Sequence, residues 1–496
     1  MRKPIIAAAI LLASTALVSG CDKVKQAVSG GAEVKDTAYP ERVFWGDTHL
    51  HTANSPDAFA FGNRLLPEDA LRFARGEEVT SSSGVKAKLD RPLDFLVISD
   101  HSDGLGSMMD LYNAPRIMIT EPHMLRWYDM MHSGQEGASR AAAEIIDAKA
   151  NNTLPPELVN PEGSEKRMRS TWEKNIDAVE DYNQPGKFTA FFGFEYTLMD
   201  GGRNLHRNVV FRDGPDKARS VLPLMSFGTT VPDQLWDYMD AYEKSTGGKV
   251  LAIPHNSNMS NGKMFMLTDP SGGPMSAAYA RRRAAHEPVV EITQIKGDSE
   301  AHPFMSPNDE FANFEIWDKG NLEGTAAKTP EMLPLEYARS ALKNGLLLEG
   351  KFGINPYKFG MAGGSDLHGG LTFSSESQYG GEVTRTAQDL TDQEMRNNLG
   401  LQIDPHRLWN AWKTSSGAVT GVWAEENTRP SIYAALRRKE TFATSGPKLR
   451  VRMFAGWSVP ATLFDDKDWV RRAYATGVPM GGDLPKRPTA APAPVF

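Results

Sequence analysis

Short apolar segments recur along this chain from residue 42 onward, and segments with helical character separate them. The apolar segments are rich in β-branched and aromatic residues, which favours buried strands. They span 43–45, 93–98, 189–194, 209–211, 250–253, 289–292, 313–317 and 359–362. Helices are expected between them, at 66–75, 232–244 and 334–346. Strands that alternate with helices are typical of parallel βαβ units, so we expect an α/β fold with a closed or nearly closed barrel.

Two parts of the chain depart from this alternation. Residues 104–187 are rich in Met, Ala, Glu and Arg and are expected to form a helical insertion on a loop of the barrel. We predict the barrel over 42–376, a C-terminal extension over 377–456 and a tail over 457–496, which has an unstructured composition from residue 480 onward. Further helices are expected at 138–150, 170–182, 405–415 and 429–440.

The first 20 residues have the organisation of a secretory signal peptide (1–20). Arg2 and Lys3 precede a mostly apolar run at 5–18, which is shorter than the about 20 residues that a membrane-spanning helix needs. Small residues then stand directly before Cys21, an arrangement that resembles a bacterial lipobox. We expect an exported protein with a lipid on Cys21 and a tether over 21–41, anchored at the periplasmic face of the inner or outer membrane. A plain signal peptide that is cut elsewhere is the alternative.

Charge and cysteine content narrow the classes of partner and site. The formal net charge is −7, and the chain has no basic stripe or long run of Lys and Arg, so nucleic acid is not expected as a partner. The single cysteine, Cys21, excludes an intramolecular disulfide framework and a cysteine-rich zinc site. A metal site in this chain would therefore rely on His, Asp and Glu.

Polar motifs stand at the ends of the first two predicted strands, which is where the site of a parallel α/β barrel lies. His49 and His51 follow the first strand, and residues i and i+2 of an extended segment point the same way. Both imidazoles can therefore reach one metal ion. His101 ends the second strand together with Asp100, which we expect to orient a neighbouring ligand.

The later strands carry similar motifs. Glu195 closes a very apolar segment, and a buried carboxylate needs a partner, which is either a bridged metal ion or a basic side chain. His206 and His255 flank predicted strands, while Asp366 and His368 share the i, i+2 arrangement and lie among glycines that allow close backbone approach. This recurrence predicts a site for more than one metal ion. The remaining histidines are expected to be surface or structural residues, at positions 123, 132, 286, 302 and 406.

In chain order, these motifs resemble the metal motifs of the PHP (polymerase and histidinol phosphatase) superfamily. The matching strings are Asp-Thr-His-Leu-His-Thr, Ile-Ser-Asp-His-Ser, Gly-Phe-Glu-Tyr, Pro-His-Asn and Gly-Ser-Asp-Leu-His. The chain is most similar to a bacterial branch catalogued as a domain of unknown function, whose signatures resemble 423–429 and 443–447. The resemblance covers 42–485 and implies a distorted (β/α)7-type barrel. It also implies that relatives continue beyond 477–482, so we expect a truncated C-terminus.

The resemblance further implies two or three divalent ions per chain, which are zinc, manganese or iron. Carried over residue by residue, the implied ligands are His49, His51, His101, Glu195, His206, His255, Asp366 and His368. Asp57, six residues after His51, matches the family's usual Asp or His at that point. Glu195 is expected to bridge two ions.

The usual chemistry of the superfamily is phosphoester hydrolysis, so the resemblance implies a phosphoesterase in which a metal-bound hydroxide attacks a small-molecule phosphate ester. His255 and Asp57 are candidates to protonate the leaving group, and Asp100 is a third candidate catalytic residue. Basic residues are expected to hold the phosphate, and Lys296 is the best placed because it follows a predicted strand. The four candidates are Arg203, Arg207, Lys263 and Lys296.

Two alternatives stay open at this point. The same metal ions would also serve an amide, carbamate or carboxylic-ester hydrolase, because a hydroxide attacks carbonyl carbon as well as phosphorus. A metal-binding lipoprotein without catalytic turnover is the other alternative, and it predicts bound metal without hydrolysis.

Overall fold

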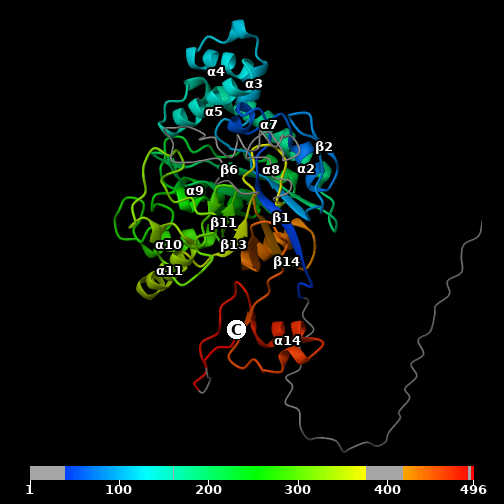
Figure 1. The fold of residues 1–496 in the computed structure, drawn as a ribbon, viewed down its shortest axis with the longest axis vertical. Coiled ribbons are helices and arrows are strands. Elements are labelled where there is room, and N and C mark those ends of the chain that lie inside the picture. The colour runs from blue at the N-terminus through cyan, green and yellow to red at the C-terminus, as the bar shows by residue number, and fades with distance from the viewer. Residues whose placement is uncertain (1–38, 160, 376–416, 490–492) are drawn as a thin grey trace, which may run out of the picture. The chain divides into compact units, whose positions relative to one another are not determined.

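The largest sheet of the fold is mixed and has its strands in the order β15-β14-β1-β4-β5. Two of them, β1 and β14, are labelled in Figure 1. β1 (Arg42–Leu50) and β5 (Thr189–Phe191) both pair in parallel with β4 (Phe95–Ile98). On its other side, β1 pairs antiparallel with β14 (Val419–Ala424), which pairs antiparallel with β15 (Thr441–Thr444). The expected parallel arrangement therefore holds for three of these strands, and β14 and β15 were not predicted.

Two smaller sheets contain the remaining predicted strands except the one expected at 313–317. β6 (Gly193–Tyr196), β9 (Arg207–Phe211) and β10 (Val250–Pro254) form an antiparallel sheet in the order β10-β9-β6. β11 (Val289–Gln294) pairs in parallel with β13 (Gly360–Gly363) and antiparallel with the short β12 (Gly297–Asp298). β6 and β9 are joined without a crossover helix, and a connection of this kind suits antiparallel strands.

The described strands form three sheets of three or more strands and three two-stranded ones, not the closed barrel that the sequence predicts. Two single bridges, Leu50 to Leu367 and His101 to Glu195, join strand ends. The three larger sheets nevertheless share a core, because one apolar cluster takes side chains from all of them. Its strand residues are Phe44, Phe95, Val97, Phe191, Val210, Leu251, Ile253, Val289, Ala362, Val422 and Ala424.

Some local predictions differ from the structure. The apolar segment 189–194 is split at Phe192, so that β5 belongs to the largest sheet and β6 to the antiparallel one. Residues 313–317 lie in turns and irregular chain instead of a strand. The helix expected at 334–346 is shifted and forms as α11 (Ala338–Phe352). The helix expected at 405–415 falls outside the described residues.

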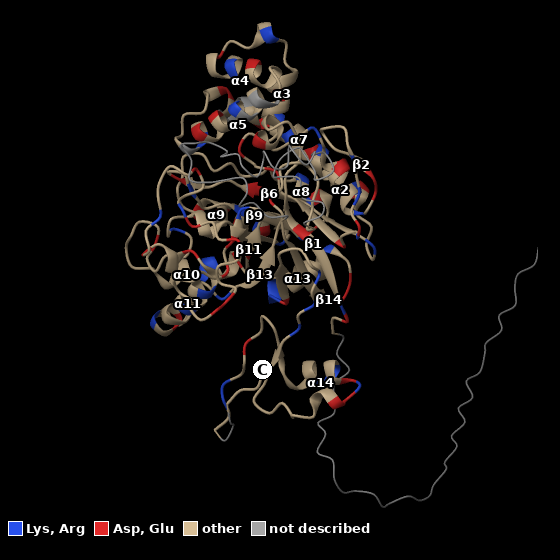
Figure 2. Cartoon of the chain, in the orientation of Figure 1, with Lys and Arg blue, Asp and Glu red and all other residues tan. Residues whose placement is uncertain are grey.

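Helices form the expected insertion between β4 and β5. They are α3 (Ser107–Asn113), α4 (Pro122–His132), α5 (Gln135–Ala150), α6 (Pro156–Val159) and α7 (Pro161–Tyr182). Acidic and basic residues are interspersed on α4 and α5 (Figure 2), and Arg126 of α4 forms an ion pair with Glu144 of α5. Elsewhere, predicted helices are confirmed as α2 (Pro67–Ala74), α9 (Asp233–Thr246) and α13 (Arg429–Arg438).

The computed structural model describes residues 39–159, 161–375, 417–489 and 493–496. The chain divides into two units, Met1–Thr37 and Ala38–Phe496, and all the elements above belong to the second. Short elements form at the end of the predicted extension, as β16 (Phe454–Ala455), and in the predicted tail, as α14 (Trp469–Thr476) and β17 (Val478–Pro479). Within the described ranges, every helix is too short or too polar to cross a bilayer.

Candidate metal centre

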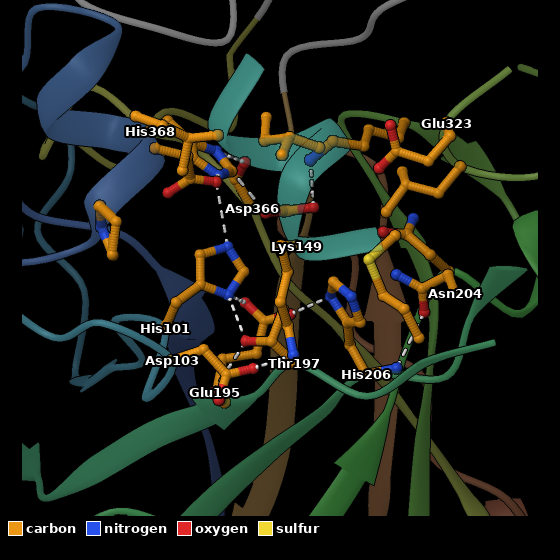
Figure 3. A pocket seen from close by; sticks show the side chains of 18 of the residues that line it. His101, Asp103, Lys149, Glu195, Thr197, Asn204, His206, Glu323, Asp366 and His368 are labelled. Atoms are coloured by element: carbon orange, nitrogen blue, oxygen red, sulfur yellow. Dashed lines mark hydrogen bonds and ion pairs between the residues drawn. The ribbon is translucent and has the colours of Figure 1, made fainter. Parts of the chain in front are cut away.

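The residues predicted as metal ligands come together at one end of the three sheets. His49 lies in β1 and Glu195 in β6, while His51, His101 and His255 directly follow or nearly follow strands. His206 precedes β9, and Asp366 and His368 lie in the loop after β13. Figure 3 shows His101, Glu195, His206, Asp366 and His368 pointing into one pocket. The short apolar strands thus position polar side chains from distant parts of the chain close together.

Glu195 lies at the middle of this cluster, and its side chain is almost fully buried. Its Oε1 atom is 2.6 Å from His206 Nδ1 and 2.9 Å from His255 Nε2. Three further imidazoles surround the other carboxylate oxygen, Oε2. One carboxylate therefore contacts five imidazole rings, an arrangement that fits a bridging ligand better than a simple ion pair.

The second oxygen of Glu195 shares its surroundings with Asp366. Glu195 Oε2 is 3.4 Å from His49 Nε2, 3.2 Å from His51 Nε2 and 3.2 Å from His101 Nδ1. Asp366 Oδ1 is 3.2 Å from both His49 Nε2 and His51 Nε2, and these two nitrogens are only 3.2 Å apart. Two imidazole nitrogens and two carboxylate oxygens thus face one common point.

Asp57 forms the other side of the cluster. It lies in α1 (Pro56–Ala60), and its Oδ2 atom is 3.0 Å from His101 Nε2 and 3.0 Å from His368 Nε2. The expected match of Asp57 to the ligand position is therefore consistent with its place in the structure. His101 contacts both Asp57 and Glu195 through its two ring nitrogens, so it joins the two halves of the site.

The donor atoms fit divalent cations in number and spacing. Four groups of them each have donor atoms within 4.8 Å of one another. Ligand atoms at about 2 Å from one ion are at most about 4 Å apart, so small adjustments would complete the shells. Among the candidate ligands, which all lie in the described part of the chain, three buried atoms make no hydrogen bond, namely Glu195 Oε2, His206 Nε2 and His255 Nδ1. The groups are His51, Asp57, His101 and His368; His49, Glu195 and His255; His49, His51 and Asp366; and His101, Glu195 and His206.

The electrostatic surroundings keep the carboxylates of the cluster ionised, which is the form that binds a cation. Burial would raise the pKa of Glu195, but His101 and His255 outweigh it and hold that pKa well below its usual value. The pKa of Asp57 is likewise low, because His101 and His368 outweigh the effect of burial. Ionised oxygens beside imidazoles are the donors that zinc, manganese and iron accept.

A second layer of side chains orients the imidazoles. Glu291 of β11 is buried and lies 3.2 Å from His49 Nδ1, on the ring edge away from Asp366. Burial would lower the pKa of His49, but Asp366 and Glu291 outweigh it and raise that pKa well above its usual value. Ser55 contacts His51 Nδ1 at 3.0 Å. Glu291 was missed from the sequence, although an acid inside an apolar strand is the signal that identified Glu195.

Asp100 supports the site by a different route from the one expected. It accepts hydrogen bonds from the Thr52 backbone N–H at 2.6 Å and from the Thr52 hydroxyl at 2.8 Å. Burial raises the pKa of Asp100 to about 6. Asp100 therefore fixes the loop that follows His51 through its carboxylate, and its backbone carbonyl oxygen accepts a hydrogen bond from the Glu195 N–H at 3.0 Å, so its place fits a positioning residue.

The candidate phosphate-binding residues are placed differently from one another. Lys296 lines the pocket, and its ammonium group contacts the Asp366 carboxylate. The expectation for Arg207 needs correction, because its buried guanidinium is 3.0 Å from the buried carboxylate of Glu287 and does not line the pocket. A buried strand position leaves that guanidinium no route to a substrate.

Arg203 and Lys263 also lie outside the pocket lining. Arg203 donates to the Asp200 carbonyl oxygen at 3.0 Å, and Lys263 is 3.7 Å from the Asp200 carboxylate. Lys149, which was not predicted, does line the pocket and forms an ion pair with Asp103 at 2.7 Å. Lys149 belongs to the helical insertion, and no local sequence motif indicates that this insertion lies beside the site.

Fold and site together define a mixed α/β protein with a candidate multinuclear metal centre at the ends of its strands. The chain belongs to the DUF3604 family, which is described as a protein of unknown function, and the family profile matches residues 38–496. This match confirms the expected domain-of-unknown-function family.

Comparison with curated proteins gives no match. Among solved structures, the chain is similar to the crystal structure of a two-domain protein containing a predicted PHP-like metal-dependent phosphoesterase from Bacteroides vulgatus. That similarity has 10% sequence identity and a TM-score of 0.31, and it covers 84% of this chain and 69% of that chain.

Proposed function

We propose that this protein is a metal-dependent phosphoesterase that acts on small-molecule phosphate esters with two or three divalent ions. The observation that carries the proposal is the buried carboxylate of Glu195 between five imidazole rings, with Asp57 and Asp366 on either side. Burying so many ionisable groups together is costly unless a cation shares them. Bound divalent ions would supply a water of lowered pKa and stabilise negative charge on the attacked group.

The chain's own residues provide the remaining functions. Asp57 and His101 line the pocket, and their Oδ2 and Nε2 atoms are 3.0 Å apart, so a cation held between them would face a bound ester. Lys296, beside Asp366, places a positive charge at the same end of the pocket. His255 is buried and does not line the pocket, which favours a role as ligand over that of proton donor.

The proposal is tested on the purified full-length chain by elemental analysis, followed by assays with p-nitrophenyl phosphate, bis-p-nitrophenyl phosphate and p-nitrophenyl acetate. We expect two or three ions per chain and metal-dependent release of nitrophenol from a phosphate ester. Glu195→Gln should lose metal and activity, whereas Glu173→Gln, on the exposed face of α7, should keep both. Activity on the acetate alone would replace the proposal with a carbonyl hydrolase, and bound metal without any hydrolysis would leave a metal-binding protein.

We also propose that the chain is exported and anchored by a lipid on Cys21. This proposal is supported by the sequence alone, because residues 1–38 lie outside the described part of the chain. Cells that express the protein should incorporate an alkyne-labelled fatty acid into it. The Cys21→Ser variant should show no label, and equal labelling of both proteins would contradict the anchor.

A further inference from the structure

The helical insertion forms an apolar wall beside the candidate metal centre. Ile145 and Ile146 of α5 and Leu154 after it line the pocket, together with Phe61 at the end of α1. α1 also carries Asp57, so the apolar wall begins only four residues along the chain from a candidate ligand. Apolar side chains that line a pocket stay in contact with water until an apolar group covers them.

Buried contacts hold this wall in place. Lys149 of α5 forms the ion pair with Asp103 and donates to Ser226 Oγ at 2.9 Å, and Asp103 lies two residues after His101. Phe59 of α1 shares an apolar cluster with Ala141 and other residues of α5. The insertion is thus attached both to the loop with His101 and to the helix with Asp57, which makes it a preformed surface for a ligand.

The rest of the pocket is mixed in character. Met199, Trp317 and Leu322 add further apolar surface. Asn204 and Glu323 also line the pocket, and Figure 3 shows them on the opposite side from His101 and His368. The end of the pocket with the histidines and lysines is charged, and the insertion provides an apolar wall. Together they favour a ligand with one anionic end and one apolar body. Asn204 and Glu323 are instead the groups that would favour a ligand with hydroxyls.

This inference rests on the proposed function. The geometry points to one substrate class, namely phosphate monoesters whose alcohol part is apolar and about the size of one aromatic ring. The phosphate would lie at the end with the histidines, near Lys149 and Lys296, and the alcohol part would cover Ile146, Leu154 and Phe61. The pocket has a volume of about 210 Å³. A cavity of about 150 Å³ holds a benzene ring, so this space fits one ring and a phosphate-sized group.

The inference is tested by calorimetry on the full-length, metal-loaded protein with non-hydrolysable probes. Benzylphosphonate should bind about tenfold or more tightly than methylphosphonate, because the ring covers apolar surface. Ile146→Ala should reduce that preference about threefold to tenfold, since the wall loses carbon atoms at the contact. Leu347→Ala, a matched change at an exposed position of α11, should leave the preference unchanged.

Hydrolysis of benzyl phosphate and of glycerol phosphate completes the test, because both leaving groups are simple alcohols. Equal binding of the two phosphonates, or faster turnover of glycerol phosphate, would overturn the inference while leaving a phosphoesterase in place. A preference for benzylphosphonate without hydrolysis of any phosphate ester would instead overturn the proposed function and leave the apolar recognition intact.

Discussion

Glu291 touches the candidate metal centre only through His49. Its two oxygens lie 3.2 and 3.3 Å from His49 Nδ1, so a carboxylate holds the ring and makes its other nitrogen a better donor. Glu291→Gln keeps the size of the side chain but removes its charge, and we expect metal affinity to fall about tenfold. A titration with a competing chelator measures the change, with Glu173→Gln as the control. Unchanged affinity would restrict Glu291 to a packing role.

Glu336 is buried beside Lys328, away from the candidate metal centre. Burial raises the pKa of Glu336 to about 7, an effect that Lys328 offsets only in part. Between about pH 4.5 and pH 7 the folded carboxyl keeps a proton that the unfolded chain loses. The free energy of unfolding should therefore fall as the pH rises through this window, by at most about 1.4 kcal/mol per pH unit for one proton.

The Glu336→Gln variant isolates this contribution, because an amide cannot titrate and can still accept the hydrogen bond from the Gly262 N–H. Urea unfolding at several pH values should give a flatter pH dependence between pH 5 and pH 7 for the variant than for the unmodified chain. Parallel curves for the two proteins would show that Glu336 does not titrate in this window.

The sequence singles out residues that the fold brings together in the candidate centre, because the pattern that marks them is local. A histidine or carboxylate within or shortly after an apolar segment is visible without the fold, as with His49, Glu195 and Asp366. The ion-pair partner of a side chain is not visible in the local sequence, which is why Arg207 was predicted to bind phosphate. Its partner Glu287 stands 80 residues away along the chain, and only the packing of the two segments brings them together.

Among the elements, β1 and β4 approach each other closely at Gly46. A Cβ atom at this position would collide with the buried ring of Phe95, its neighbour in β4. We expect Gly46→Ala to destabilise the fold by about 1–3 kcal/mol, because the ring cannot move without disturbing the core. At Gly350 in α11, an added Cβ atom would meet open space. We expect Gly350→Ala to stabilise the fold by about 0.5–1 kcal/mol.

Chemical denaturation of both glycine variants gives the comparison directly. A Gly46→Ala variant as stable as the unmodified chain would mean that β1 and β4 can separate locally.

The elements show where sequence patterns stop being informative. Apolar runs identify β4, β10 and β11, but the pattern of such a run does not reveal its partner. The direction of β6, β9 and β10 depends on the connections between them, and the missing crossover helix after residue 196 was the signal for an antiparallel pair. The break at Phe192, which sends β5 and β6 to different sheets, has no counterpart in composition.

For the whole molecule, the candidate centre depends on the complete fold. Its ligands run from His49 to His368, and they come from all three sheets and from α1. An unfolded chain holds these groups far apart, so tight binding requires the folded state. Ions that bind only the folded state stabilise it by mass action.

Removal of the ions should therefore lower the stability of the whole protein. At a free ion concentration about 100 times the dissociation constant, one site contributes about 2.7 kcal/mol. We expect the chain treated with a strong chelator to unfold at a lower urea concentration, followed by tryptophan fluorescence, and zinc or manganese to restore the original transition. Glu195→Gln should show a much smaller shift on chelation, because it lacks the carboxylate that five imidazoles contact. Identical transitions with and without chelator in the unmodified chain would mean that the cluster folds equally well without a cation, and the case for a metal centre would then fail.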